Sequence, residues 1–308
     1  MFDRDPIPGA IRAAVSFVGG IAAPVRNPLK KAIVGLAGRV APQSTERVVL
    51  WLASIKSNHA SAETPLMDIF DAVLIPVLYL AAVKVGNRLM RDRKPFSMKT
   101  FGMLHNLFSM ALSLYLSVAI FYEAFWVHRH SLIGGNAVDE SPSGARLAEL
   151  FWVFYFSKLP EFNDTLIMVL KKSTRQITFL HTYHHASMIL ICWMGCWVAP
   201  GGDCLFNCLV NSFVHVIMYG YYFFSMVGVK QVSFIRPYIT RLQIAQFSSI
   251  LVREMCTLLS YALGRPTGFP IGIVVAETAY NLSMLALFLT FYRAAYTSKL
   301  STGTKKDE

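Results

Sequence analysis

The stretch ITFLHTYHHASMILICWMGCWV, residues 177–198, places three histidines in an otherwise apolar run. His181, His184 and His185 stand at positions i, i+3 and i+4, so a helix would project all three within an arc of about 100°. A run of this length is long enough to cross a bilayer. Ionisable side chains at membrane depth are costly and normally face the interior of a helix bundle. The stretch therefore predicts a membrane helix that turns a histidine face toward other helices.

The rest of the chain has the same apolar character. Hydrophobic residues make up 54% of its 308 residues and charged residues only 15%, with a mean hydropathy of +0.45. Soluble domains have about a quarter of their residues charged. Apolar segments long enough to span a membrane cover 66–85, 100–127, 150–170, 177–198, 205–227, 238–263 and 269–292. The sequence predicts an all-α polytopic membrane protein with seven transmembrane helices.

Basic residues concentrate in alternate loops between these segments. They are Arg88, Arg91, Arg93, Lys94 and Lys99 after the first segment, Lys171, Lys172 and Arg175 after the third, and Lys230 and Arg236 after the fifth. The positive-inside rule puts these loops and the C-terminus in the cytosol. Because the net charge of +11 falls in membrane-flanking loops, we expect a lipid partner and no nucleic acid.

Both ends of the chain lie outside the apolar segments. Residues 1–62 form an N-terminal extension with five basic residues and no acid between residues 6 and 45. We expect an interfacial amphipathic or disordered segment, favoured over an organelle presequence. Its Gly and Pro content argues against one long helix. Residues 63–298 form the helical domain. The tail, residues 299–308, ends in KKDE, which resembles the dilysine retrieval signal of endoplasmic-reticulum membrane proteins.

A charged cluster, KLPEFNDT at residues 158–165, interrupts the third segment. On a helix, Lys158, Glu161 and Thr165 share one face and Asp164 lies to the side. Pro160 predicts a kink. Two interpretations remain open at this point, a buried ion pair that fixes helix packing and a direct catalytic role.

Two further polar patterns lie on later segments. In NSFVHVIMYGYYF, residues 211–223, helical spacing aligns Asn211, His215, Tyr219 and Tyr222 in one narrow stripe, and the histidine helix is its expected partner. In TRLQIAQF, residues 240–247, Gln243 and Gln246 stand three apart. These glutamines either hydrogen-bond between helices or line a substrate cavity.

Taken together, these motifs resemble those of the ELO family of membrane fatty-acid elongases, the 3-ketoacyl-CoA synthases of the endoplasmic reticulum. The matching patterns are K-x-x-E-x-x-D-T, H-x-x-H-H, N-x-x-x-H-x-x-M-Y-x-x-Y and T-x-x-Q-x-x-Q-F, and the resemblance extends over about residues 93–299. It implies seven membrane helices, six of which enclose an acyl tunnel that opens to the cytosol. The implied reaction condenses an acyl-CoA with malonyl-CoA to a 3-ketoacyl-CoA two carbons longer, releasing CO₂ and CoA.

The resemblance also implies roles for individual residues. His184 would be the nucleophile that forms an acyl-imidazole, and His215 would assist malonyl-CoA binding and decarboxylation. His181 and His185 would orient and tune them, and Asn211 would support His215. The implied substrate-binding set is Lys158, Glu161, Asp164, Gln176, Tyr219, Tyr222, Gln243, Gln246, Lys171, Lys172 and Arg175. The last three suit CoA phosphates, although setting the topology is an equally good role for them.

The resemblance further implies that acyl-CoA and malonyl-CoA act without a cofactor or metal. It implies a working association with the ketoreductase, dehydratase and enoyl reductase of the elongation cycle. Gln176 and the residues around the histidine motif look most like members that act on long-chain or polyunsaturated substrates.

Two other classes of protein use buried histidines. A membrane di-iron desaturase or hydroxylase needs about eight histidines in three boxes, whereas His59, His105, His128 and His130 form no second box. A seven-helix transporter or receptor could carry a buried proton relay, but the short loops indicate no docking surface.

Overall fold

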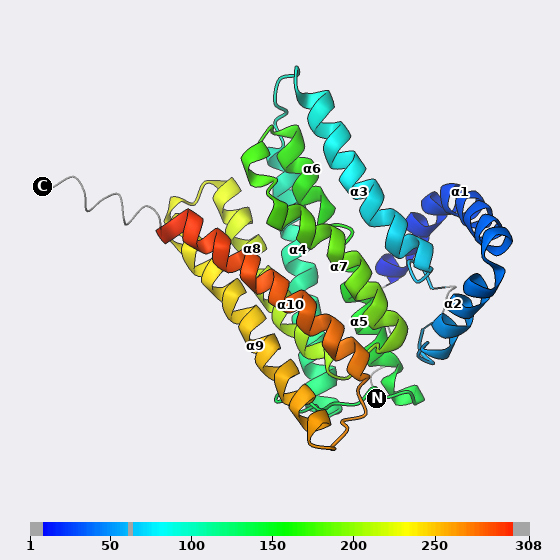
Figure 1. Cartoon of the computed structure of the whole chain (residues 1–308). Coiled ribbons are helices and arrows are strands. Elements are labelled where there is room, and N and C mark those ends of the chain that lie inside the picture. The colour runs from blue at the N-terminus through cyan, green and yellow to red at the C-terminus, as the bar shows by residue number, and fades with distance from the viewer. Residues whose placement is uncertain (1–8, 61–63, 298–308) are drawn as a thin grey trace, which may run out of the picture.

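The computed structural model describes residues 9–60 and 64–297, and the regular elements in those ranges are all helices (Figure 1). They are α1 (Gly9–Val40), α2 (Pro42–Ser54), α3 (Ile69–Met90), α4 (Lys99–Ile120), α5 (Ala145–Ser157), α6 (Phe162–Leu170), α7 (Phe179–Val198), α8 (Cys204–Val227), α9 (Arg236–Ala262) and α10 (Ile271–Tyr292). The all-α prediction is confirmed. The KKDE tail lies outside the described residues.

Among the residues that the structure describes, four helices are long and apolar enough to cross a membrane. They are Ile69–Met90, Lys99–Val127, which includes a π-helical continuation of α4, Cys204–Val227 and Ile271–Tyr296. Three histidines make α7 more polar, and α9 carries Arg241, Arg253 and Glu254. These four helices make the chain a multi-pass membrane protein. The count of seven spans stays a prediction.

The third predicted span is not a continuous helix. α5 ends at Ser157 and α6 begins at Phe162, with residues 158–161 in a turn between them. Pro160 lies in this turn, and a proline has no N–H to continue a helical ladder. The predicted kink is confirmed, but the single segment 150–170 is wrong. The break brings Lys158 and Glu161 to the interior of the bundle, where both are buried.

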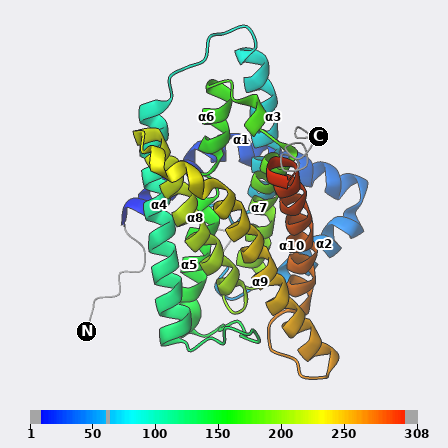
Figure 2. The ribbon, with the colours of Figure 1, turned by 90° about the vertical axis from the view of Figure 1, so that its left-hand side faces the viewer.

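The helices pack as three long pairs, α4 with α8, α9 with α10, and α3 with α7 (Figures 1 and 2). α5 lies between α4, α7 and α8. Its contact with α7 depends on Gly195, because a Cβ at this position would lie 2.6 Å from the Phe151 ring. This close approach holds the histidine helix against α5 and the turn that follows it.

The start of α3 is fixed to α5 and α7 by aromatic side chains. Trp152 Nε1 donates to the carbonyl of Pro65 at 3.0 Å, and Tyr155 donates to that of Leu66 at 3.1 Å. Trp193 Nε1 donates to the carbonyl of Met67 at 2.9 Å. Buried backbone carbonyls need such partners because no water reaches them.

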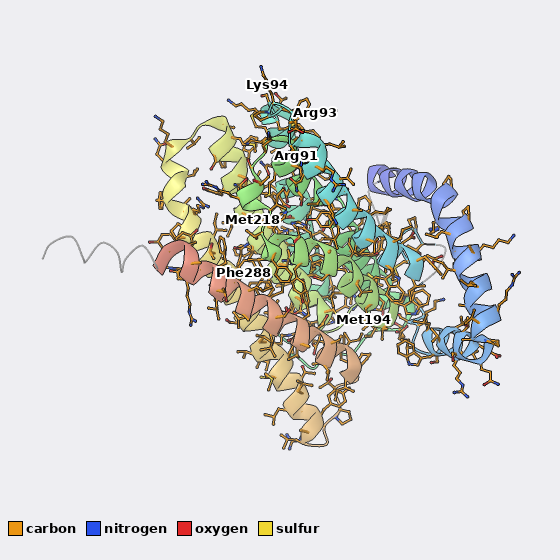
Figure 3. All side chains as sticks on the ribbon, turned by 45° about the horizontal axis from the view of Figure 1, so that its top comes forward. Arg91, Arg93, Lys94, Met194, Met218 and Phe288 are labelled. Atoms are coloured by element: carbon orange, nitrogen blue, oxygen red, sulfur yellow. The ribbon has the colours of Figure 1, made fainter. Side chains whose placement is uncertain are left out.

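The predicted basic loops meet at one end of the bundle. The backbone N–H of Phe96 donates to the carbonyl of Leu170 at 3.0 Å. Lys172 Nζ donates to the carbonyls of Arg91 and Arg93 at 2.9 and 3.1 Å. Figure 3 shows Arg91 and Arg93 together at this end, which we name the basic end.

The opposite end is closed by a buried ion pair. Arg253 of α9 donates to the Asp203 carboxylate and to its carbonyl, both at 2.6 Å. The backbone N–H groups of Gly135 and Asn136 and the Thr257 hydroxyl donate to the same carboxylate. These bonds hold the loop after α4 against the start of α8 and the last turns of α9.

The extension differs from the sequence expectation. α1 is one helix of 32 residues that continues through Pro24 and Pro28, so the expectation that Gly and Pro prevent a long helix is wrong. Proline is tolerated here at the cost of backbone hydrogen bonds one turn earlier. Ion pairs from Arg26 to Asp71 and from Lys30 to Asp68 join α1 to the beginning of α3.

Candidate active site

The histidine motif occupies the first two turns of α7. The Thr178 hydroxyl caps this helix by accepting from the backbone N–H of His181 at 3.2 Å. The histidine rings lie next to one another, with ring centres 4.4 Å apart for His181 and His185 and 5.6 Å apart for His184 and His185. The single arc that the spacing predicts is therefore present in the structure.

His184 is held at one ring nitrogen only. Its Nδ1 lies 3.1 Å from the Tyr280 hydroxyl of α10. Over residues 9–60 and 64–297, no hydrogen bond reaches its Nε2. An imidazole whose Nδ1–H is donated to a neighbour presents a lone pair at Nε2, which is the arrangement that a histidine nucleophile needs.

The other two histidines of the motif contact α3 and α6. His181 Nε2 lies 2.7 Å from the Thr165 hydroxyl, which is itself 2.9 Å from the hydroxyl of Tyr79. His185 is buried, with its ring centre 6.2 Å from that of Tyr79 and 6.3 Å from that of Phe162. These contacts fix the helix face from which His184 projects.

A second chain of contacts begins in the turn between α5 and α6. Lys158 Nζ lies 2.7 Å from Glu161 Oε1 and donates to Asn211 Oδ1 at 3.2 Å. The same Glu161 oxygen lies 3.3 Å from His215 Nδ1. All four side chains are buried. The ion pair interpretation is therefore correct for Lys158 and Glu161, and the pair also touches the second histidine.

Among the described residues, the Asn211 side chain makes no hydrogen bond to the His215 side chain. It reaches that histidine through Lys158 and then Glu161. A carboxylate at Nδ1 fixes the tautomer and orientation of an imidazole and stabilises its protonated form, as in hydrolase triads. His215 is thus placed to act as a base or a hydrogen-bond donor through Nε2.

Asp164 joins two further helices to this centre. Its Oδ1 lies 2.9 Å from Nε2 of His105 in α4, and its Oδ2 accepts from the Tyr219 hydroxyl of α8 at 2.8 Å. Tyr219 also contacts the His215 ring edge-on, with centres 5.6 Å apart. Asp164 is therefore committed to protein partners on both oxygens.

The polar stripe of α8 has a different partner from the expected one. Asn211, His215 and Tyr219 contact Lys158, Glu161 and Asp164 respectively. The prediction that the stripe pairs with the histidine helix is therefore wrong for these hydrogen bonds and this ion pair. Charged groups form stronger hydrogen bonds than neutral imidazoles do, and the broken helix places those charges beside α8.

Within the described part of the chain, the remaining predicted residues make no side-chain hydrogen bond to this centre. Gln246 is buried in α9, and Gln243 donates to Met218 Sδ at 3.8 Å. Tyr222 is half-exposed at the edge of the stripe. Gln176, Lys171, Lys172 and Arg175 are exposed at the basic end. The structure therefore separates a largely buried polar set around the histidines from an exposed set at the basic end.

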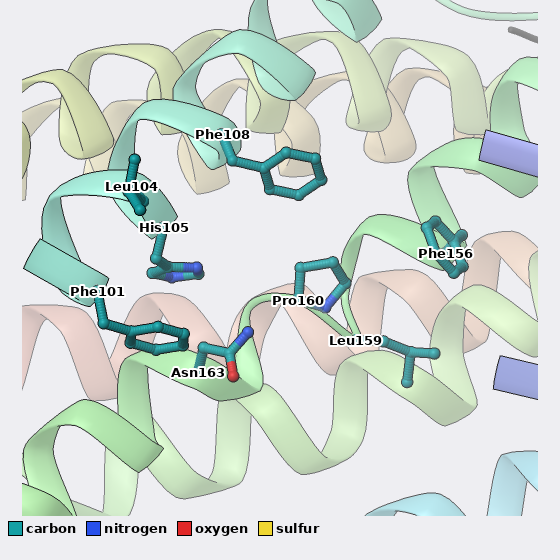
Figure 4. A pocket seen from close by; sticks show the side chains of 8 residues that line it. All are labelled: Phe101, Leu104, His105, Phe108, Phe156, Leu159, Pro160 and Asn163. Atoms are coloured by element: carbon teal, nitrogen blue, oxygen red, sulfur yellow. The ribbon is translucent and has the colours of Figure 1, made fainter. Parts of the chain in front are cut away.

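An apolar groove of about 670 Å³ lies beside the centre, between α4 and the break between α5 and α6 (Figure 4). Phe101, Leu104 and Phe108 line it from α4, and Leu159 and Pro160 line it from the turn. His105 and Asn163 supply its polar wall. A volume of this size is in the range of small-molecule sites, about 300–1,000 Å³.

Three residues of the site were not found from the sequence. They are Tyr79 of α3, His105 of α4 and Tyr280 of α10, which lie in apolar spans outside the motifs named above. Their signal was their polarity, because a polar group at membrane depth needs a partner. Which partner it finds depends on helix packing. Within the described ranges, no three His, Cys, Asp or Glu side chains are grouped as a metal site.

Comparison with known proteins identifies the class of this helical membrane chain. The model of the family described as "ELO: GNS1/SUR4 family" matches residues 64–304, and the chain belongs to this family. It is 34% identical over 227 residues to the mouse (Mus musculus) protein named very long chain fatty acid elongase 2, covering 73% of this chain and 76% of that protein.

Two other relatives carry a similar name. The mouse very long chain fatty acid elongase 5 is 35% identical over 227 residues, covering 72% of this chain and 73% of the relative. The Xenopus laevis protein of the same name is 31% identical over 282 residues, covering 90% of this chain and 88% of the relative.

Proposed function

We propose that this chain is a condensing enzyme of fatty-acid elongation, which joins an acyl-CoA and malonyl-CoA into a 3-ketoacyl-CoA two carbons longer. Family membership supports the reaction class. The observation that supports the mechanism is a pair of histidines, the part-buried His184 and the buried His215, each held at Nδ1 by a neighbouring side chain. No cofactor takes part in this proposal.

The first step transfers the acyl group to His184. Its Nε2 attacks the thioester carbonyl carbon, the C–S bond breaks, and CoA leaves with the proton that His184 releases. Tyr280 accepts from Nδ1 and holds the ring during the attack. The bundle interior excludes water, which protects the acyl-imidazole from hydrolysis.

The second step forms the new carbon–carbon bond. Malonyl-CoA loses CO₂, and the electron pair left on its C2 attacks the carbonyl carbon of the acyl-imidazole. The imidazole of His184 leaves and takes up one proton from solvent. His215, oriented by Glu161, stabilises the enolate as a donor, since preorganised donors at a developing charge lower a barrier strongly.

The supporting residues keep these two imidazoles in place. His181 and His185 fix the α7 face through Thr165, Tyr79 and the contact between their own rings. Asn211 holds Lys158, which in turn holds Glu161, while Tyr219 and Asp164 brace α8 against α6. In this proposal, Gln243, Gln246 and Tyr222 line the path of the acyl chain.

The wider setting completes the proposal. Seven membrane passes, counting the α5–α6 pair as one, put the basic end in the cytosol, where Lys171, Lys172, Arg175 and Gln176 meet CoA. The endoplasmic reticulum is the compartment that the KKDE tail supports. The ketoreductase, dehydratase and enoyl reductase that consume the product are the expected functional partners.

The test is a membrane assay with labelled malonyl-CoA and a panel of acyl-CoAs. We expect the wild-type chain to extend long-chain substrates by two carbons and His184→Ala to incorporate no label. Mass spectrometry of wild type incubated with acyl-CoA alone is expected to find the acyl group on residue 184. The control is Phe179→Leu, an exposed position on the same helix. Equal incorporation by wild type and His184→Ala would refute the mechanism.

A further inference from the structure

Two helices before the family-matched region leave apolar side chains uncovered. α2 has no buried residue along its 13 positions. Val48, Val49, Leu50 and Trp51 are 54–61% exposed. Four adjacent exposed apolar side chains are unusual on a surface that water covers.

α1 adds a second apolar surface. Leu29, Ile33, Leu36 and Val40 are all exposed and recur at helical spacing, so they fall within an arc of about 60° on one face. The other faces of this helix carry basic residues. Between residues 9 and 56 the sequence has seven Lys and Arg residues and one Glu. An apolar stripe on a basic helix is the pattern of helices that lie in a membrane interface.

Contacts at both ends fix this pair of helices to the bundle. At one end, Arg26 pairs with the buried Asp71 at 2.9 Å, and Lys30 pairs with Asp68. At the other, Trp197 Nε1 of α7 donates to the carbonyl of Leu52 at 3.0 Å. The side chains of α1 that pair with α3 lie to one side of its apolar stripe, so docking leaves the stripe uncovered.

The place of these helices in the fold suits a bilayer boundary. They lie beside the end of the bundle where α3 begins and α7 ends, opposite the basic end (Figure 1). α3 itself exposes Val73, Val77 and Leu78 along its outer side. Because α3 crosses the membrane, this exposed side meets lipid, and its N-terminal end marks the level at which the headgroups begin.

We propose that α1 and α2 form an interfacial platform that inserts its exposed apolar residues between the headgroups and acyl chains of the leaflet opposite the basic end. The occupant of the uncovered face is lipid. Lys31, Arg39 and Arg47 are exposed and reach lipid phosphates, as long basic side chains do at this depth. The platform fixes the depth of α3 in the bilayer. Because α7 packs against α3, the platform also fixes the depth of α7. This inference is independent of the catalytic proposal.

Trp51 is a natural probe for the test. The full chain is reconstituted in phosphatidylcholine vesicles, once with ordinary lipid and once with lipid brominated on the acyl chains. The difference in fluorescence between wild type and Trp51→Phe reports Trp51 alone. We expect its emission to be blue-shifted, quenched by the brominated lipid and protected from iodide in the water. Trp193, which is buried in the protein, gives the unquenched reference through Trp193→Phe.

A charge on the apolar face separates insertion from a chance contact. Leu50→Glu is expected to move Trp51 toward water, so that iodide quenches it and brominated lipid does not. Gln43→Glu puts the same charge on an exposed polar position of the same helix, and it is expected to leave Trp51 in lipid. Free access of iodide to Trp51 in the wild type would overturn the proposal. Protection from both quenchers would also overturn it, because protein would then cover this face.

Discussion

The Glu161 carboxylate lies 3.3 Å from Nδ1 of His215, joining the turn between α5 and α6 to the middle of α8. We expect Glu161→Gln to lower turnover about 10²–10³-fold, the range for loss of one donor at a developing negative charge. The reason is that an amide cannot stabilise a positive imidazole. CoA release from acyl-CoA alone is expected to survive, while ketoacyl product is lost. Asp92→Asn, at an exposed loop position, is the control. Equal loss of both half-reactions would make Glu161 a purely structural residue.

The buried Lys158–Glu161 pair has a separate effect on stability. Lys158→Met leaves the Glu161 charge without its cation, which costs about 3–5 kcal/mol in buried sites. Lys158→Met combined with Glu161→Gln removes both charges, so much of the stability is expected to return. Thermal unfolding in detergent micelles measures both variants. A double variant no more stable than the single one would contradict this account.

Tyr280→Phe tests how His184 is held. The change removes the hydroxyl 3.1 Å from His184 Nδ1 and keeps the ring. We expect formation of the acyl adduct to slow about fivefold, because one hydrogen bond contributes about 1 kcal/mol. Tyr183→Phe is a matched control, since its hydroxyl meets Ser283 across the same α7–α10 contact and no histidine. Rapid-quench measurement of CoA release would reveal the difference, and identical rates in the two variants would contradict the role of Tyr280.

Gly195→Ala tests the approach of α5 to α7. Its new methyl group would lie 2.6 Å from the Phe151 ring, which is buried and cannot move aside freely. We expect a loss of about 1–3 kcal/mol, as for other overpacked cores. Gly272→Ala in α10 meets no atom within 4 Å, so it should be neutral or gain up to about 1 kcal/mol of helix propensity. Unfolding temperatures in micelles compare the two.

The basic end offers a test of CoA binding. Lys171→Ala and Arg175→Ala are each expected to raise KM for acyl-CoA by a few fold, since exposed ion pairs contribute about 0.2–1 kcal/mol. The effect should shrink as salt is added. Lys172→Ala is expected to loosen the loop before α4 instead, because its Nζ holds the carbonyls of Arg91 and Arg93. If KM is unchanged in all three variants, these residues do not bind CoA and serve only to set the membrane topology.

Much of the architecture could be predicted from short segments of the sequence. Six of the seven apolar segments correspond to single helices, and with the π-helical continuation of α4 to Val127 counted, their ends lie within about five residues of the predicted ones. The third failed because Pro160 and the charged residues around it end one helix and start another. Hydropathy averaged over a window does not resolve a four-residue turn.

The sequence predicted which residues form the site better than it predicted which of them contact one another. Helical spacing placed His181, His184 and His185 on one face, and it placed Asn211, His215 and Tyr219 on another. It did not show that the second face meets Lys158, Glu161 and Asp164. That pairing depends on the order of helices around the bundle, in which α5 and α6 lie between the histidine helix and α8.

The sequence by itself determined that this chain is helical, lies in a membrane and carries the motifs of its family, because hydrophobic length, helical period and residue spacing are local properties. Only the tertiary structure decided that Tyr280 holds His184, that Glu161 holds His215, and that α1 docks on the start of α3. Each of these contacts joins residues far apart in the chain. Their partners were selected by which helices pack side by side, a choice that no single segment encodes.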